Sequence, residues 1–219
     1  MTPKKPRDQS SPRGWHSRGY LPHFDGGHEL PQSVTFRLAD SLPARVIAQW
    51  LEELRVQPTE KRERELRKRI QEFLDTGYGA CHLREPRIGL LVETALLYFD
   101  AERYRLHAWV VMPNHVHALF TPLPAWSLSR ILGSWKSYTA TEANKMLGTS
   151  GQFWQEDYFD RFIRDAEHFE VARNYIEMNP VKASLCRLPE DWAFGSARHR
   201  HSLGIVGAAK MAAVPGEIP

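Results

Sequence analysis

Residues 104–120, YRLHAWVVMPNHVHALF, decide the fold and pose the main question about the site. The first half of the stretch is rich in β-branched and aromatic residues, and the last six residues are again mostly apolar. Pro113 and Asn114 interrupt the run, so the stretch predicts a β-hairpin. Because successive side chains of a strand point to opposite faces, His115 and His117 are expected to share one face.

Two histidines on one strand face have two interpretations. They can form part of a metal site, since imidazole suits transition ions and two such ligands leave positions open for a phosphate oxygen. They can also be ordinary polar residues of a half-exposed sheet. The chain has a second such pair, His199 and His201, in the polar stretch ARHRHS, which we interpret as a basic tail. The apolar strand pattern around His115 and His117 sets them apart, but it leaves both interpretations of them open.

The other segments extend the hairpin into an α+β pattern. Strands are expected at 33–38 and 158–164, and helices at 42–54, 60–75, 84–100, 126–147 and 165–179. This order predicts a ferredoxin-like antiparallel sheet with helices packed on one face. The charged connection at about 43–85 is an extra helical insertion to which we assign no role. Asn179 and Pro180 are expected to end the last helix, because the residue before a proline disfavours the α conformation.

The chain of 219 residues is long enough for one domain with a substantial core. We expect the folded domain at residues 32–192 and a flexible tail at 193–219. Residues 1–31 are rich in Gly, Pro and Ser and interleave aromatic with basic side chains. They predict an irregular N-terminal arm, which is either a loose tail or a segment that lies along a nucleic acid.

The composition places broad limits on the class of protein. Lys and Arg number 29 against 26 Asp and Glu, and a net charge of +3 permits a nucleic-acid partner without requiring one. No apolar run approaches the ~18 residues of a membrane span, and the N-terminus lacks the apolar segment of a signal peptide. Cys81 and Cys186 form no CxxC pair. We expect a cytoplasmic protein with no membrane partner.

Tyr175, in the segment RNYIEMNP, is the notable candidate nucleophile. The chain has no P-loop, GxSxG or HExxH motif, whereas a tyrosine can attack a phosphate covalently. Asn179 follows four residues later and is expected on the same helix face. Tyr175 could instead be an ordinary surface aromatic, and Asn179 could cap a following turn. A free phenol has a pKa near 10, so it would need help to react.

Three segments in order carry a family resemblance: WVVMPNHVHALF (109–120), FWQEDYFDRFIR (153–164) and NYIEMNPVKASL (174–185). They resemble the single-strand DNA transposases of the HUH class and are most similar to the REP-associated tyrosine transposases. The resemblance spans roughly residues 32–192, which it identifies as an HUH transposase-like catalytic domain. RGYLPHFDGG (18–27) also resembles the N-terminal arm of some members.

The resemblance implies specific roles for these residues. His115 and His117 would bind a divalent metal ion, Mg²⁺ or Mn²⁺, and Tyr175 would be the nucleophile. Asn179 would be a candidate third metal ligand, although the insertion-sequence relatives typically have glutamine there. Tyr175 would cleave and rejoin single-stranded DNA at hairpin sequences, forming a 5′-phosphotyrosine and releasing a 3′-hydroxyl.

Several basic residues are candidates for contacts with DNA phosphates. They are Arg13 and Arg18 in the arm and Arg130, Lys136, Arg161 and Arg164 in the folded domain. Two other functions remain possible: a metal-free module that binds single-stranded nucleic acid, and a metal-dependent nuclease that uses water. The sequence leaves open the choice between a monomer and a homodimer.

Overall fold

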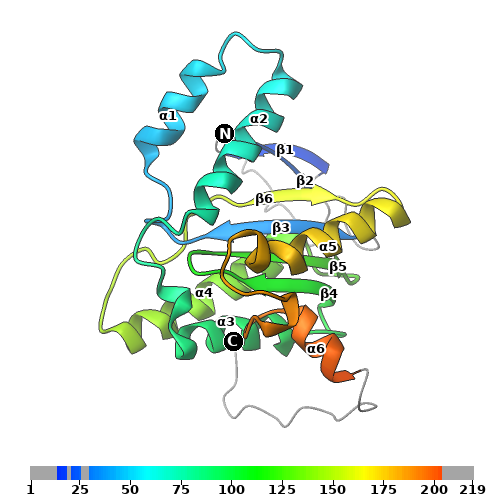
Figure 1. Cartoon of the computed structure of the whole chain (residues 1–219). Coiled ribbons are helices and arrows are strands. Elements are labelled where there is room, and N and C mark those ends of the chain that lie inside the picture. The colour runs from blue at the N-terminus through cyan, green and yellow to red at the C-terminus, as the bar shows by residue number, and fades with distance from the viewer. Residues whose placement is uncertain (1–13, 19–20, 26–29, 204–219) are drawn as a thin grey trace, which may run out of the picture.

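The structure, a computed structural model, describes residues 14–18, 21–25 and 30–203 (Figure 1). The strands are β1 (Gly14–Arg18), β2 (Leu21–Asp25), β3 (Gln32–Arg37), β4 (Tyr104–Val111), β5 (His115–Pro122) and β6 (Phe159–Phe162). The α-helices are α1 (Ala44–Glu53), α2 (Thr59–Asp75), α3 (Pro86–Tyr98), α4 (Leu128–Leu147), α5 (Ala166–Lys182) and α6 (Ser196–Leu203). Short 3-10 helices lie at His82–Arg84 and Pro189–Asp191.

The main sheet has four antiparallel strands in the order β4-β5-β3-β6. The predicted hairpin is present as β4 and β5, and β3 pairs with the other edge of β5. His117 stands between Val110 of β4 and Thr35 of β3 in the register. The predicted α+β class with an antiparallel sheet is therefore confirmed, and the two histidines lie on a strand in the interior of the sheet.

Helices α3 and α4 cover the sheet face opposite the two histidines (Figure 1). Val116, Ala118 and Phe120 of β5 are fully buried on this face. They share a core with residues of α3 and α4 such as Leu96 and Trp135. This packing is what the alternation of β5 predicts, because these three residues occupy alternate positions of the strand and point away from the histidines.

Helix α5 lies on the other face of the sheet, which corrects the expectation that the helices pack on one face. Ile176 of α5 is buried with Val110 and Leu119, residues that share the face of the histidines. The strands β4 and β5 are apolar on both faces, so a helix on one side alone would leave this second stripe in water. We call the face that carries His115, His117 and α5 the histidine face.

Helix α5 also continues past the predicted end at Asn179. It runs to Lys182, and Pro180 lies inside it. Pro180 has no N–H to donate to the turn before it. The next turn is nevertheless helical, since the Ala183 N–H donates to the Asn179 carbonyl over 3.0 Å. Asn179 is therefore a helical residue and does not cap a following turn.

The two ends of the described chain are more ordered than predicted. Residues 14–18 and 21–25 form the antiparallel pair β1 and β2, not an irregular arm. The Phe24 N–H of β2 donates to Asp160 Oδ2 of β6 over 2.7 Å. The predicted tail after residue 192 includes helix α6, where buried Ser196 donates to Glu177 Oε1 over 2.7 Å. His199, which we assigned to a basic tail, has its Nε2 3.3 Å from Glu93 Oε1.

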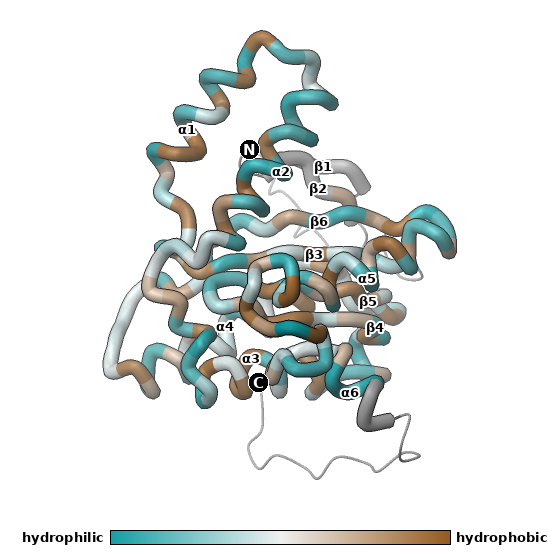
Figure 2. Tube along the Cα trace, in the orientation of Figure 1, coloured by the Kyte–Doolittle hydropathy of each residue, from teal (hydrophilic) through white to brown (hydrophobic). Residues whose placement is uncertain are grey.

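Helices α1 and α2 occupy the predicted insertion and have a small core of their own. Leu66, Ile70 and Leu74 of α2 are buried against residues of α1, and Phe159 of β6 packs on the same cluster. Figure 2 shows that most of α2 outside this stripe is hydrophilic. No helix among the described residues has the length and apolar character needed to cross a membrane.

Gly89 of α3 allows a test of how closely α3 packs against Phe194 and Leu83. A Cβ at Gly89 would lie 2.6 Å from Phe194 Cε2 and 2.9 Å from the Leu83 carbonyl oxygen. We expect Gly89→Ala to lower the free energy of unfolding by about 1–3 kcal/mol, measured by urea denaturation.

The matched control is Gly133→Ala in α4, where a Cβ would meet no atom within 4 Å. This variant should be neutral or stabilised by up to about 1 kcal/mol, because alanine favours a helix over glycine. Equal effects of the two substitutions would contradict the packing described for Gly89.

Candidate active site

His115 and His117 lie side by side on the histidine face, as the strand periodicity predicts. Both side chains are buried, and their Nε2 atoms are 3.1 Å apart. The two rings are nearly perpendicular, with an interplanar angle of 87°. The pair therefore directs two ring nitrogens at one point.

Hydrogen bonds hold both imidazoles by their Nδ1 atoms. His115 Nδ1 is 2.7 Å from Asn114 Oδ1. The amide nitrogen of Asn114 donates to two backbone carbonyls at and beyond the end of α2, so its Oδ1 is left to accept from His115. His117 Nδ1 is 2.7 Å from Thr35 Oγ1 of β3. With Nδ1 of His115 as the donor, its Nε2 carries a lone pair that can bind a metal.

The protein keeps both rings neutral. Burial lowers the pKa of His115 well below its ordinary value, and the neighbouring His117 adds to this effect. Burial lowers the pKa of His117 to about 3, with a further contribution from Lys182. Neutral imidazole is the form that binds metal ions.

Helix α5 brings Tyr175 and Asn179 to the histidines, as the spacing of four residues predicts. The rings of Tyr175 and His117 have their centroids 5.7 Å apart. Asn179 Nδ2 lies 3.3 Å from His117 Nε2, while Asn179 Oδ1 is buried and has no hydrogen-bond partner among the described residues. Because the oxygen and nitrogen of an amide can exchange places by rotation, Asn179 can present an oxygen to the same point.

These donors fit a divalent metal ion. Nitrogens about 3 Å apart match two ligands that lie about 2.1 Å from one ion at a right angle. The unpartnered Asn179 oxygen becomes a further ligand at the same place once the amide is rotated. No cluster of three or more His, Cys, Asp or Glu side chains suited to a metal occurs within residues 14–18, 21–25 and 30–203. The candidate metal site therefore consists of His115, His117 and Asn179.

Asp75 and Lys182, which no sequence pattern singled out, complete the surroundings of the site. Asp75 Oδ1, at the end of α2, lies 3.8 Å from His115 Nε2. Burial raises the pKa of Asp75 to about 6, against the opposing effect of a hydrogen bond from Gln71. The Nζ of Lys182 lies 4.6 Å from the centre of the Tyr175 ring. No local spacing links residue 75 to residue 115, so only the folded chain shows this contact.

Tyr175 is half-buried, and its environment disfavours the phenolate. Burial raises the pKa of the phenol above its ordinary value, and the nearby charge of Asp75 raises it further. A hydrogen bond with Asn179 acts in the opposite direction. The phenol is therefore protonated at neutral pH, and any attack by its oxygen must be accompanied by loss of the proton.

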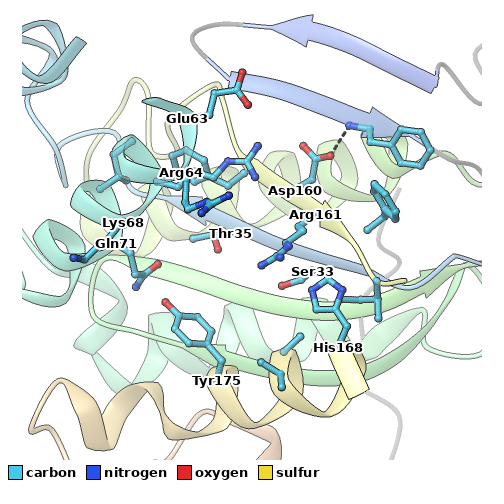
Figure 3. A pocket seen from close by; sticks show the side chains of 18 of the residues that line it. Ser33, Thr35, Glu63, Arg64, Lys68, Gln71, Asp160, Arg161, His168 and Tyr175 are labelled. Atoms are coloured by element: carbon cyan, nitrogen blue, oxygen red, sulfur yellow. Dashed lines mark hydrogen bonds between the residues drawn. The ribbon is translucent and has the colours of Figure 1, made fainter. Parts of the chain in front are cut away.

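A cleft of about 990 Å³ leads to Tyr175 (Figure 3). Its walls come from β3 and β6 of the sheet and from helices α2 and α5. Arg161 and Arg164, two of the predicted phosphate contacts, line this cleft together with Tyr175. A substrate bound in this cleft would therefore lie beside Tyr175.

The other predicted phosphate contacts lie elsewhere. Arg130 and Lys136 belong to α4, on the opposite side of the sheet from the histidines. The Arg130 guanidinium donates to the Ala125 carbonyl, and the Lys136 ammonium donates to two carbonyls that precede β6. The backbone of Arg18 forms the end of β1, and Arg13 lies outside the described residues.

Comparison with known proteins shows which family the segment that carries the site resembles. The model of the family described as "Transposase IS200 like" matches residues 91–179, a segment that contains the two histidines, Tyr175 and Asn179. The chain is therefore similar to IS200-like transposases.

Two particular proteins narrow the comparison. The REP-associated tyrosine transposase of Escherichia coli (strain K12) is 29% identical over 135 residues, which are 57% of this chain and 77% of that protein. The solved structure of a REP-associated tyrosine transposase bound to a REP hairpin has a TM-score of 0.49 and 16% identity. Its match covers 91% of this chain and 94% of that chain. The resemblance to REP-associated tyrosine transposases indicated by the sequence motifs is confirmed.

Proposed function

We propose that this protein is a metal-dependent transposase that cleaves and rejoins single-stranded DNA at hairpin sequences through a 5′-phosphotyrosine. One observation carries the proposal: the Tyr175 ring lies 5.7 Å from the ring of His117, at a cleft open to substrate. A nucleophile beside a candidate metal site is the arrangement that phosphoryl transfer requires. The similarity to transposases, one of them a REP-associated tyrosine transposase, supports DNA as the substrate.

His115, His117 and Asn179 would hold the metal ion, Mg²⁺ or Mn²⁺. When bound, the ion supplies a positive charge that polarises a phosphate oxygen and stabilises the charge developing on it. The hydrogen bonds of the two Nδ1 atoms with Asn114 Oδ1 and Thr35 Oγ1 fix both rings in place. Fixed ligands of this kind keep a metal site ordered for the reaction.

Tyr175 would attack the phosphorus of a DNA phosphodiester. A bond forms between its phenolic oxygen and phosphorus, and the bond between phosphorus and the 3′ oxygen breaks. The phenol loses its proton and the 3′ oxygen gains one, so a 3′-hydroxyl leaves. One phosphodiester replaces another, and a different 3′-hydroxyl can reverse the step without ATP. The positive charge of Lys182, near the Tyr175 ring, would stabilise the negative charge that develops on the phenolic oxygen during this step.

Arg161 and Arg164 would contact phosphates of the DNA in the cleft, because both line it beside Tyr175. Arg13 and Arg18 of the N-terminal segment would add contacts with a hairpin. Arg130 and Lys136 are not used in this account, since they lie on α4 across the sheet. In this proposal residues 32–192 form the catalytic domain.

The direct test is a denaturing gel of the full chain with labelled DNA and Mn²⁺ or Mg²⁺. The DNA is a hairpin with a single-stranded extension. We expect a protein–DNA band that survives denaturation and is lost when EDTA removes the metal. Cleaved DNA without a covalent band would indicate a nuclease that uses water. Binding without any product would indicate a nucleic-acid-binding module.

A further inference from the structure

Helix α2 lies outside the segment that matches the transposase family, yet it forms one wall of the cleft at Tyr175. Its residues Arg64, Arg67 and Lys68 line the cleft. Across from them, β6 contributes Arg161. The charged insertion therefore faces the candidate active site and is not only a solvated surface.

The arginines from the two walls converge. Figure 3 shows Arg64 and Arg161 pointing toward each other in the middle of the cleft, between Asp160 and Tyr175. Burial lowers the pKa of Arg161, and the charges of Arg164, Arg67 and Arg64 lower it further. These guanidinium groups are thus close enough to repel one another, and such a cluster favours an anion between them.

The acidic side chains of the described residues do not form ion pairs with this cluster of arginines. Arg64, Arg67 and Arg161 form no ion pair with any acidic side chain in the described part of the chain. The Nε atom of Arg67 is buried without a hydrogen-bond partner among the described residues. A buried donor without a partner is costly, so an external acceptor at this place would be stabilising.

Acidic residues also line the same cleft, namely Glu60, Glu63, Glu72, Asp75 and Asp160. All of these except Glu60 are engaged or directed elsewhere. Glu72 lies 3.8 Å from Lys68, and Asp160 accepts the Phe24 N–H. Asp75 lies beside His115, and Glu63 points away from the arginines in Figure 3. The centre of the cleft is left to the guanidinium groups.

Aromatic side chains also line the cleft. The rings of Phe24 and Phe162 have centroids 4.8 Å apart, and both residues line the cleft with His168. Aromatic faces beside positive charges are typical of sites for single-stranded nucleic acid, because only unpaired bases expose their own faces.

We propose that Arg64 and Arg67 of α2, together with Arg161 of β6, bind the phosphates of the single-stranded segment that leads to Tyr175. The insertion formed by α1 and α2 is then a clamp on that strand. This inference rests on the proposed function and deepens it, because it assigns the single-stranded part of the substrate to the α2 wall.

The test compares two double variants of the full chain. Arg64→Gln with Arg67→Gln removes two charges from the cleft. Lys61→Gln with Arg62→Gln removes two charges from positions of the same helix that do not line the cleft. The probes are fluorescein-labelled (dT)16 and a blunt DNA hairpin without a single-stranded extension. Fluorescence anisotropy gives the affinity of each over a salt titration.

We expect the cleft variant to bind (dT)16 at least about tenfold more weakly than the wild type. The slope of log affinity against log salt should fall by about 1.4 in magnitude, since two contacts with single-stranded phosphates are lost. The control variant should bind (dT)16 as the wild type does, apart from a small charge effect. The blunt hairpin should bind all three proteins alike.

An equal loss of (dT)16 affinity in both double variants would overturn the inference, as would a loss for the blunt hairpin as large as that for (dT)16. Adduct formation by the wild type with the extended hairpin separates the two proposals. If the adduct forms but the cleft variant binds (dT)16 normally, the clamp is wrong and the proposed function stands. If the wild type forms no adduct, the proposed function is wrong. Wild-type protein that fails to bind (dT)16 overturns the clamp.

Discussion

Tyr175→Phe is expected to bind hairpin DNA with an extension normally and to form no covalent adduct. The substitution removes the phenolic oxygen and keeps the ring that contacts His117. Since the oxygen must become the phosphate ester, cleavage should fall by about 10⁴-fold or more, as for other lost nucleophiles. Single-turnover cleavage with Mn²⁺, followed on a denaturing gel, measures the effect.

Tyr158→Phe is the matched control. Tyr158 is buried in the core on the face opposite the histidines, with 7% of its surface exposed. It cannot reach the cleft that contains Tyr175, so this variant should retain substantial activity once its fold is checked by thermal denaturation. Normal cleavage by Tyr175→Phe would mean that another residue or water is the nucleophile.

His117→Ala is expected to abolish both metal binding and adduct formation. His117 is the central residue of the candidate metal site, because its Nε2 lies 3.1 Å from His115 and 3.3 Å from Asn179. Loss of a ligand should weaken Mn²⁺ binding at least about 100-fold, more than the loss of a supporting residue does. Isothermal titration calorimetry with Mn²⁺ measures this without DNA or activity.

His107→Ala is the control for this experiment. His107 is a partly buried histidine of β4 whose Nε2 lies 2.8 Å from Thr121 Oγ1, away from the metal site. Its loss should leave Mn²⁺ affinity within about twofold. His117→Gln keeps most of the side-chain volume, so it replaces the alanine variant in this titration if the alanine variant unfolds. Unchanged Mn²⁺ binding by folded variants of His117 would remove the metal site from the account.

The parts of the site that sequence could predict depend on local periodicity. Alternation along β5 is enough to place His115 and His117 on one face. A spacing of four residues is enough to place Tyr175 and Asn179 together on a helix. Both expectations hold, since the strand and the helix have the predicted type over these residues.

The remaining features depend on tertiary packing. Val110 and Leu119 are apolar residues on the histidine face, and α5 buries them. No local pattern in the sequence identifies α5 as the helix that packs on this face. The contact of Asp75 with His115, and the approach of Arg64 to Arg161, join positions far apart in the chain. The charged α2 segment received no role from the sequence, because periodicity does not show what a helix faces.

The central claim is that Tyr175 becomes covalently bound to DNA, and peptide mass spectrometry of the adduct tests it most directly. The adduct is trapped with Mn²⁺, the DNA is trimmed with a nuclease, and the protein is digested with trypsin. We predict that the peptide NYIEMNPVK, residues 174–182, carries the nucleotide, with the added mass on Tyr175. A nucleotide on another residue, or cleaved DNA with an unmodified peptide, would contradict the account.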